Sequence, residues 1–233
     1  PKIEENYTGL IEQGPRRVSP FFIPGAIINM VSGLMSMRYN LQGPNFSIVT
    51  ACATGGHNIG ESARLIRDNV ADVMLSGGTE ASTDRLCISG FTSARAMSRR
   101  NDAPQQASRP WDKDRDGFVL AEGGATLILE DYEHASRRGA KIYAELTGYG
   151  VSSDAHHMTN PAPGGEGATL AMKMALKETK LGKESISYVN AHGTSTPAGD
   201  GLESMAIRNV FGDHADKLWV SSTKSMTGHA LGG

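Results

Sequence analysis

The sequence predicts an α/β fold, in which short β-strands alternate with α-helices. Short apolar runs typical of buried strands recur along the chain, and segments of helical composition separate them. Many of these runs end in glycine-containing turns, and the 28 glycines lie in such turns rather than in a repeat. Ligands of open α/β sheets bind beyond the carboxyl ends of the strands. The turns that follow strands are therefore the first places in which to look for function.

The first third of the chain predicts helix, strand, helix and strand. Segment 20–43 is apolar and contains Pro24 and Gly25, and its helical spacing predicts a buried helix with a face formed by Ile27, Met30, Val31 and Leu34. A strand is expected at 46–50, followed by a helix at 60–69. The next strand is expected at 71–76, ending at the pair Gly77 and Gly78.

The remaining elements continue the alternation. Two strands are expected at 118–120 and 125–130, joined by a turn at 122–124. A helix at 131–138 ends with Gly139 as its C-cap, and the alternating pattern of 142–150 predicts a further strand. After a long loop rich in Pro, Gly and His, the order expected is helix, strand, helix and strand, at 168–180, 186–190, 200–211 and 218–222.

Composition indicates a soluble globular protein of one large or two modest domains. The chain has 233 residues, of which 39% are hydrophobic and 21% charged, and its formal net charge is −2. No global charge points to nucleic acid or an anionic membrane. No run approaches the ~20 apolar residues of a membrane span, and no signal peptide is visible at the start. Two cysteines, neither in a CxxC pair, favour a reducing cytoplasm.

Cys52 is the most informative residue. It lies where the apolar run Val49-Thr50-Ala51 gives way to small residues that open a helix-like segment. A thiol near a helix N-terminus feels the positive end of the helix dipole, which can lower the usual cysteine pKa of about 8.5 to roughly 3.5–7.5. The pattern predicts a nucleophile. A small buried hydrophobe is an equally good interpretation of the local sequence.

Two later strand ends carry reactive residues in similar turns. The strand at 186–190 leads into Ala191-His192-Gly193-Thr194-Ser195-Thr196-Pro197, and the strand at 218–222 leads into Thr223-Lys224-Ser225-Met226-Thr227-Gly228-His229. Because strand ends of an open sheet share one edge, we expect Cys52, His192, Lys224 and His229 to line a common pocket.

Together these motifs resemble the β-ketoacyl-acyl carrier protein synthases, the condensing enzymes of fatty acid synthesis, and most closely the synthase II type. The resemblance covers essentially the whole chain. It rests on 50–55 around Cys52, 190–197 around His192 and 222–229 around His229, joined by Arg109-Pro110-Trp111-Asp112 and Asp116-Gly117-Phe118-Val119.

The resemblance implies a thiolase-like fold, in which two similar α/β halves form an αβαβα layered core, usually in a homodimer. By that comparison residues 1–140 are the later part of the N-terminal half, which carries the nucleophile. Residues 141–233 are the first part of the C-terminal half, which carries both histidines. The chain is then expected to be truncated at both ends, without a loop that supplies one oxyanion-hole N–H.

The resemblance also implies roles for the site residues. Cys52 would hold an acyl chain as a thioester, and its own N–H would serve as one oxyanion donor. His192 and His229 would donate through Nε2 to the malonyl thioester carbonyl and stabilise the enolate formed as carbon dioxide leaves. Lys224 would hold the loop of His229 and add positive potential.

Supporting residues follow from the same comparison. The hydroxyls of Thr194 and Thr196 would bind pantetheine amides, although both residues also suit a turn that satisfies its own backbone. Phe91 would line the acyl pocket, and a core role suits it nearly as well. Arg16, Arg17 and Arg95 would dock the acidic acyl carrier protein, and a role as ordinary solvated surface arginines suits them nearly as well.

No cofactor or metal is expected. Asp154, His156 and His157 crowd one loop, but the helical spacing of a zinc site is absent and the condensation needs no metal. Cys87 is expected to be structural. A degradative thiolase, a polyketide ketosynthase and a non-catalytic partner subunit are the competing functions. The thiolase is not expected to show these histidine contexts, and the partner subunit usually lacks the cysteine.

Overall fold

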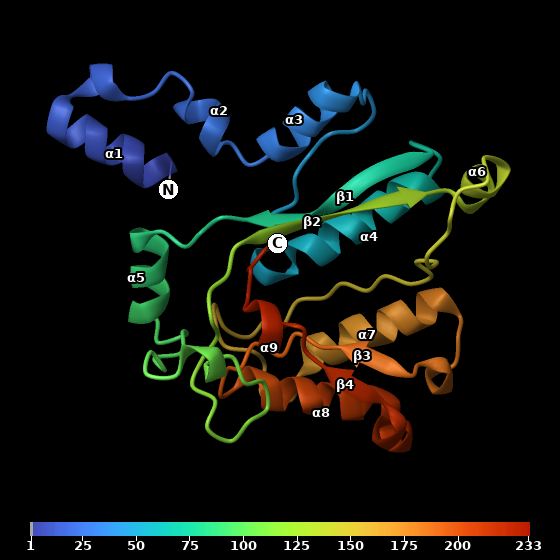
Figure 1. Ribbon diagram of the computed structural model, residues 1–233. Helices are drawn as coiled ribbons and strands as arrows, with labels where there is room; N and C mark the ends of the chain where they lie inside the picture. Colours follow the sequence, from blue (N-terminus) through green and yellow to red (C-terminus); the bar gives the residue numbers. More distant parts are fainter. Residues whose placement is uncertain (1) are drawn as a thin grey trace. The chain divides into compact units, whose positions relative to one another are not determined.

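The computed structural model describes residues 2–233, which form two compact units (Figure 1). The first unit runs to Ser89 and also contains Glu122–Lys141 and Ala230–Gly233. The second unit contains Gly90–Ala121 and Ile142–His229. Both units combine helices with strands, so the predicted α/β class is confirmed. Within the described residues, no helix has the length and apolar character needed to cross a membrane.

A two-stranded antiparallel sheet and one helix form the centre of the first unit. Strand β1 (Val73–Glu80) pairs with β2 (Gly123–Glu130) in a register that places Val73 opposite Glu130 and Glu80 opposite Gly123. Helix α4 (Thr54–Arg67) packs against both strands (Figure 1). Its buried positions are Gly60 and Ser62. Small residues at these positions let the helix lie close to the sheet.

The predicted end of β1 at its glycine pair is wrong, because the strand continues through Gly77 and Gly78 to Glu80. A Cβ on Gly77 would collide with the backbone oxygen of Ala125 on β2, and one on Gly78 would collide with the backbone oxygen of Gly232. These glycines therefore mark close backbone approach inside a strand, not a turn. The helix expected at 60–69 also begins earlier, at Thr54.

The N-terminal region of the first unit is helical but not buried as predicted. Helix α1 (Lys2–Gln13) precedes α2 (Phe22–Ala26) and α3 (Met30–Tyr39). The predicted single buried helix over 20–43 is wrong, since the chain is interrupted at Ile27 and the expected apolar face is open: Val31 is 53% and Leu34 58% exposed. Helical spacing identified the helices correctly, but no described element covers that face.

The strand predicted at 46–50 is absent from the described structure, although the segment leads directly into Cys52. Its backbone donors are taken by side chains of α4 instead of a neighbouring strand. The Ile48 N–H donates to Asn58 Oδ1 at 3.2 Å, and the Thr50 N–H donates to Thr54 Oγ1 at 2.9 Å. The segment is thereby fixed to the start of α4 without a sheet ladder.

The second unit is built on a parallel strand pair. Strands β3 (Tyr188–Asn190) and β4 (Trp219–Ser221) pair in register, with α8 (Gly199–Phe211) as the crossover between them. Helix α7 (Glu166–Thr179) packs against α8 (Figure 1). The apolar core contains Ile207, Val210 and Phe211 of α8, with Met172, Leu176, Ile186, Val189, Ala215 and Leu218 packed around it. The four elements predicted after residue 166 are confirmed.

Two predicted strands outside this core are not strands. Residues 118–120 form only isolated bridges, from Phe118 to Met97 and from Leu120 to His229. Segment 142–150 is irregular because it lies along α7: the Tyr149 N–H donates to Glu178 Oε2 at 2.7 Å, and a Cβ on Gly150 would collide with the backbone of Ala171. The alternating sequence pattern of 142–150 therefore accompanies packing against a helix and not pairing in a sheet.

Two shorter helices lie between β1 and α7 in the sequence. Helix α5 (Arg85–Ser93) begins after Asp84, whose carboxylate accepts the Cys87 N–H at 2.9 Å. Helix α6 (Tyr132–Arg137) confirms the predicted helix and its cap. Asp131 accepts the His134 N–H at 2.9 Å, and Gly139 follows the helix with a φ of 68°.

Candidate active site

Two neighbouring strand ends in the second unit place the predicted histidines and lysine. His192 is the second residue after β3, and Lys224 begins the short helix α9 (Lys224–Thr227) just after β4. His229 follows α9 and is held by the backbone of 119–121: its N–H donates to Val119 O at 2.7 Å, and its carbonyl accepts the Ala121 N–H at 3.0 Å. The parallel pairing of β3 and β4 thus brings both motifs to one edge.

The imidazole rings of the two histidines pack against each other, and two phenylalanine rings continue the series of ring contacts from His229. The centroids of His192 and His229 lie 5.3 Å apart with the rings nearly perpendicular. Phe118 packs edge-on against His229 at 5.4 Å, and Phe91 packs edge-on against Phe118 at 5.2 Å. Phe118 was not predicted as a site residue, although it lies in a motif that carried the resemblance. The two phenylalanine rings form an apolar surface beside His229, with Phe91 at its far end.

Both histidines are neutral at pH 7. Burial, with the nearby His192 and the positive charge of Lys224, lowers the pKa of His229 from 6.5 to about 4. Burial and then Lys224 lower the pKa of His192, while Glu203 and Asp200 partly oppose that shift. His229 is only 3% exposed, whereas His192 keeps some exposed surface. A neutral imidazole carries one N–H donor and one acceptor nitrogen, so each ring can donate one hydrogen bond to a developing oxyanion.

The pKa of His229 predicts a pH dependence of stability. Its folded pKa of about 4 lies below 6.5, so the unfolded chain binds more protons between these values. Stability is therefore full above pH 6.5 and falls as the pH drops toward 4, by up to about 3 kcal/mol from this group. We expect His229→Gln to flatten the fall in unfolding free energy over that range in urea titrations of the complete protein. His156→Gln, which removes an exposed imidazole, is the matched control. An equal fall in wild type and His229→Gln contradicts the assignment.

The turn from His192 to Pro197 has an unusual backbone that needs support. Gly193 and Ser195 have φ angles of 39° and 69°, in the left-handed region, and Ser195 is fully buried. Glu203 of α8 accepts the N–H groups of His192 and Gly193 at 2.6 and 2.8 Å. Ser222 Oγ donates to the Gly193 carbonyl at 2.8 Å. A side chain on Gly193 would also meet Trp111 and Ser222, so glycine is required there.

Glu203 is a site residue that sequence reasoning missed. The sequence feature that could have indicated it is an acidic residue on the helix after the His192 turn, one helical turn beyond Asp200. Glu203 reaches the N–H groups of the turn only because α8 packs back against it. The pattern predicted the helix but could not reveal this contact.

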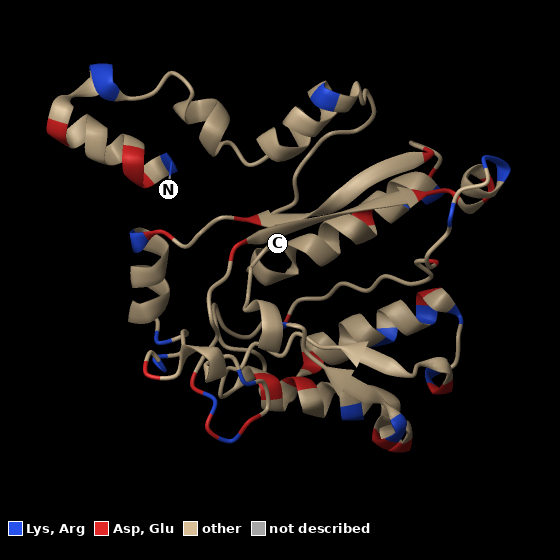
Figure 2. Cartoon of the chain, in the orientation of Figure 1, with Lys and Arg blue, Asp and Glu red and all other residues tan. Residues whose placement is uncertain are grey.

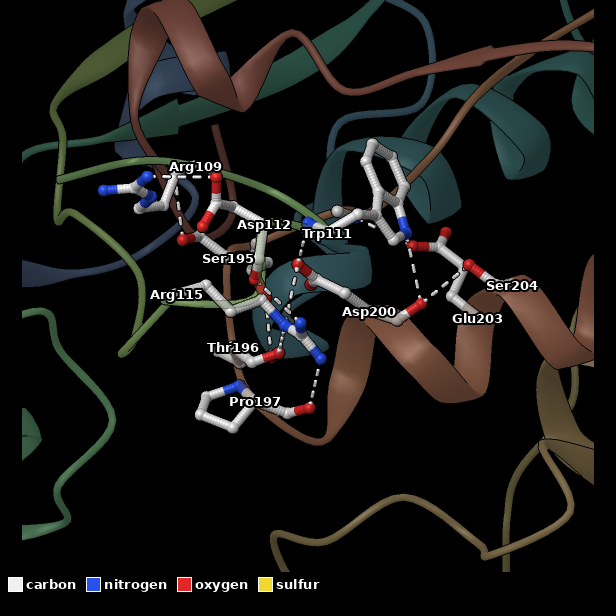
Figure 3. Close-up of polar contacts among 12 residues, drawn as sticks. Arg109, Trp111, Asp112, Arg115, Ser195, Thr196, Pro197, Asp200, Glu203 and Ser204 are labelled. Atoms are coloured by element: carbon white, nitrogen blue, oxygen red, sulfur yellow. Dashed lines mark hydrogen bonds and ion pairs between the residues drawn. The ribbon is translucent and has the colours of Figure 1, made fainter. Parts of the chain in front are cut away.

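Segment 109–117 buttresses the same turn (Figure 3). The Arg109 N–H donates to Ser195 Oγ at 3.0 Å, and the Gly117 N–H donates to the Ser195 carbonyl at 3.0 Å. Trp111 donates twice to Asp200, from its backbone to Oδ2 at 2.9 Å and from its indole to the carbonyl at 3.1 Å. Asp200 is 1% exposed, so these bonds are shielded from water.

The predicted pantetheine-binding threonines lie together in this turn. The hydroxyl oxygens of Thr194 and Thr196 are 3.1 Å apart, and Thr194 is buried while Thr196 is half-buried. Gly199 leaves room for Thr196 Oγ1, which a Cβ there would crowd at 2.5 Å. The hydroxyl pair is therefore held at a defined place next to the His192 turn.

Cys52 lies in the first unit, as an exposed thiol in the 3₁₀ turn Ala51–Ala53 that leads into α4. Ala51 before it has a φ of 51°, which is rare for a residue with a side chain. Thr50 Oγ1 and His57 Nδ1 are hydrogen-bonded at 2.7 Å and tie the turn to α4. An exposed thiol at a helix start has the placement predicted for a nucleophile, and its exposure contradicts the interpretation as a buried hydrophobe.

The three arginines predicted to dock a partner are all exposed. Arg16 and Arg17 form a 3₁₀ turn with Pro15 in the first unit. Arg95, in the second unit, lines a shallow hollow with Met97, Arg99 and Asp116. Figure 2 shows basic and acidic residues interspersed along the ribbon of each unit. Any docking by these arginines would therefore rest on local charge.

The loop that invited a metal interpretation uses its polar atoms for its own backbone. Asp154 Oδ2 accepts the Ala162 N–H at 3.0 Å. His157 Nδ1 accepts the N–H groups of Thr159 and Asn160, both at 3.1 Å. These bonds give Asp154 and His157 a structural role in the loop.

The fold and the two strand-end motifs define a thiolase-like α/β protein with a paired-histidine site. Residues 2–135 match the family model described as "Beta-ketoacyl synthase, N-terminal domain", and residues 143–233 match "Beta-ketoacyl synthase, C-terminal domain". The chain belongs to the β-ketoacyl synthase family.

Similar proteins agree with this family. The chain is 60% identical to the 3-oxoacyl-[acyl-carrier-protein] synthase 2 of Coxiella burnetii, over 100% of this chain and 56% of that protein. It is 55% identical to the enzyme of that name from Vibrio cholerae, over 99% and 56%. The chain thus spans about half the length of these curated relatives.

Solved structures agree on the fold. A β-ketoacyl synthase from Burkholderia phymatum STM815 matches with a TM-score of 0.92 and 38% identity, covering 100% of this chain and 56% of that one. A chain from the complex of a type II PKS acyl-carrier protein with its hexaketide-bound ketosynthase matches with a TM-score of 0.95 and 37% identity, covering 99% and 58%. These matches confirm the predicted thiolase-like fold class.

Proposed function

We propose that the complete protein condenses malonyl-acyl carrier protein with a cysteine-bound acyl chain and gives 3-oxoacyl-acyl carrier protein, an elongation step of fatty acid synthesis. The observation that carries this proposal is the pair of neutral histidines in perpendicular contact at neighbouring strand ends. Decarboxylation of a malonyl thioester forms an enolate, and hydrogen-bond donors held in place beside its oxygen stabilise the developing negative charge. The relatives named 3-oxoacyl-[acyl-carrier-protein] synthase 2 support the same reaction.

The residues divide the reaction between them. Cys52 attacks the acyl thioester of the carrier protein, so that a new carbon–sulfur bond forms and the pantetheine thiol leaves. His192 and His229 donate to the malonyl thioester oxygen while carbon dioxide departs and the enolate forms. The enolate carbon then attacks the acyl carbon on Cys52; the carbon–carbon bond forms and the Cys52 sulfur leaves. Burial keeps the histidines neutral, and the positive charge of Lys224 also lowers their pKa values and adds positive potential near the enolate.

Binding and assembly are part of the proposal. Thr194 and Thr196 hold pantetheine, Phe91 lines the acyl chain, and Arg16, Arg17 and Arg95 contact the acidic carrier protein. A matched solved structure pairs a ketosynthase with its acyl-carrier protein, which supports this class of partner. We further propose a homodimer, a division into halves at residues 140 and 141, and a cytoplasmic location, where both cysteines remain thiols.

A polyketide ketosynthase is the second candidate, because one matched structure belongs to a polyketide system. The identity to that structure is 37%, whereas the identity to the 3-oxoacyl-[acyl-carrier-protein] synthase 2 of Coxiella burnetii is 60%. The higher identity favours fatty acid elongation.

The proposal is tested by incubating the complete protein with an acyl-acyl carrier protein and malonyl-acyl carrier protein. We expect carbon dioxide and a 3-oxoacyl carrier protein longer by two carbons, detected by intact mass. Repeated condensation without reduction, giving a poly-β-keto chain, would instead favour the polyketide alternative. Absence of any carbon–carbon bond formation contradicts both.

A further inference from the structure

Arg115 donates to three backbone carbonyls (Figure 3). Its Nη1 donates to Asp112 O at 2.9 Å, its Nε to Thr196 O at 2.9 Å and its Nη2 to Pro197 O at 2.6 Å. Its Nε also lies 3.6 Å from Oδ2 of the buried Asp200, and its own side chain is 19% exposed. A guanidinium held by three carbonyls and a buried carboxylate is fixed in place.

The contacts of Arg115 complete the support of the His192 turn. At the start of the turn, Glu203 accepts the N–H groups of His192 and Gly193. In the middle, Ser195 O accepts from Gly117. At the end, the carbonyls of Thr196 and Pro197 accept from Arg115. Buried backbone polar groups must be paired, and this turn is strained at Ser195, so its shape depends on these partners.

Arg115 acts on the end of the turn that carries the hydroxyl pair. Thr196 contributes both the carbonyl that Arg115 holds and the hydroxyl that lies 3.1 Å from Thr194. His192 lies at the other end, where Glu203 and Ser222 hold the backbone. Loss of Arg115 therefore frees the threonine end first and leaves the anchors of His192 in place.

We propose that Arg115 is a positioning residue that fixes the Thr194–Thr196 hydroxyl pair for binding the pantetheine arm of both thioester substrates. This inference rests on the proposed function. A lysine cannot replace it fully, because one ammonium cannot reach three carbonyls in the planar arrangement that the guanidinium provides.

The test compares Arg115→Met and Arg115→Lys with the control Arg208→Met in the complete protein. Arg208 also pairs with an acidic residue, Asp216, but both side chains are more than 60% exposed. For Arg115→Met we expect the KM values for acyl- and malonyl-carrier protein to rise together by about tenfold or more, since hydrogen bonds to a charged group are lost. The kcat should stay within about threefold, with Arg115→Lys intermediate and Arg208→Met at the wild-type values.

Two further readouts separate positioning from general damage. Alkylation of Cys52 by iodoacetamide needs no pantetheine, and we expect its rate to be unchanged in Arg115→Met. Thr196→Val should raise KM less in the Arg115→Met background than in wild type, because the two residues act on one contact. If Arg115→Met does not fold, Arg115→Lys carries the test with the same readouts.

The outcomes distinguish this inference from the function on which it rests. Unchanged KM values in folded Arg115 variants of a condensing wild type overturn the inference alone. A fall in kcat and in Cys52 alkylation without a KM change also overturns it, since that pattern marks a purely structural role. A wild-type protein that does not condense overturns the proposed function.

Discussion

Replacing Cys52 with alanine in the complete protein should reduce condensation by at least roughly 10³-fold, since loss of the nucleophile in an acyl-transfer enzyme costs up to about 10⁶. The thiol is exposed, follows a residue in the left-handed region and precedes α4, which is the placement of a reactive side chain rather than of a core residue. The measurement is the rate of 3-oxoacyl carrier protein formation with both thioesters supplied.

Cys87→Ala is the matched control, because Cys87 is half-buried and its backbone N–H donates to Asp84 at the start of α5, a contact that alanine keeps. We expect it to keep the wild-type rate. Cys52→Gln should retain malonyl decarboxylation while losing condensation, because the histidines remain. Condensation at the wild-type rate in Cys52→Ala would show that the nucleophile is elsewhere.

Replacing His229 with alanine should lower malonyl decarboxylation and condensation together by about 100–1000-fold, the cost of one oxyanion donor. The ring is 3% exposed and neutral at pH 7, and it lies between Phe118 and His192. As a neutral imidazole it keeps one N–H, which can donate to the developing oxyanion. The measurement is carbon dioxide release from malonyl-acyl carrier protein, with acylation of Cys52 followed separately.

His229→Asn keeps an amide N–H donor and should retain part of the activity that His229→Ala loses. His134→Gln is the control, because His134 of α6 lies in the other unit, where it pairs with Glu130 of β2. Equal loss of Cys52 acylation and decarboxylation in His229→Ala would contradict the assigned role, since the histidine is not expected to act in the acylation step.

The second unit was predicted closely because its elements bury a local apolar core. Helix α8 has its apolar residues Ile207, Val210 and Phe211 on one face, and short apolar runs flank it as β3 and β4. The failures have a common physical cause. Segment 46–50 is a short apolar run and segment 142–150 alternates, and both patterns predicted strands. N–H groups of these segments donate instead to side chains of α4 and α7, and the sequence pattern does not reveal such partners.

The site was predictable to the extent that its residues follow strands. The turns after β3 and β4 pointed to His192, Lys224 and His229 as candidate site residues, and the structure places all three after those strands. Phe118, Glu203 and Arg115 were missed as site residues because they contribute through contacts made only when distant segments fold together. The lowered pKa of His229 could not be predicted from the sequence either, because burial in the folded chain is its largest cause.

The central claim is that the acyl chain is carried on Cys52. The most direct measurement is peptide mapping by mass spectrometry after the complete protein is incubated with an acyl-acyl carrier protein and no malonyl substrate. The account predicts an acyl mass increment on the peptide that contains Cys52, which disappears when malonyl-acyl carrier protein is added. An increment on Cys87, or none on any cysteine while condensation proceeds, would contradict it.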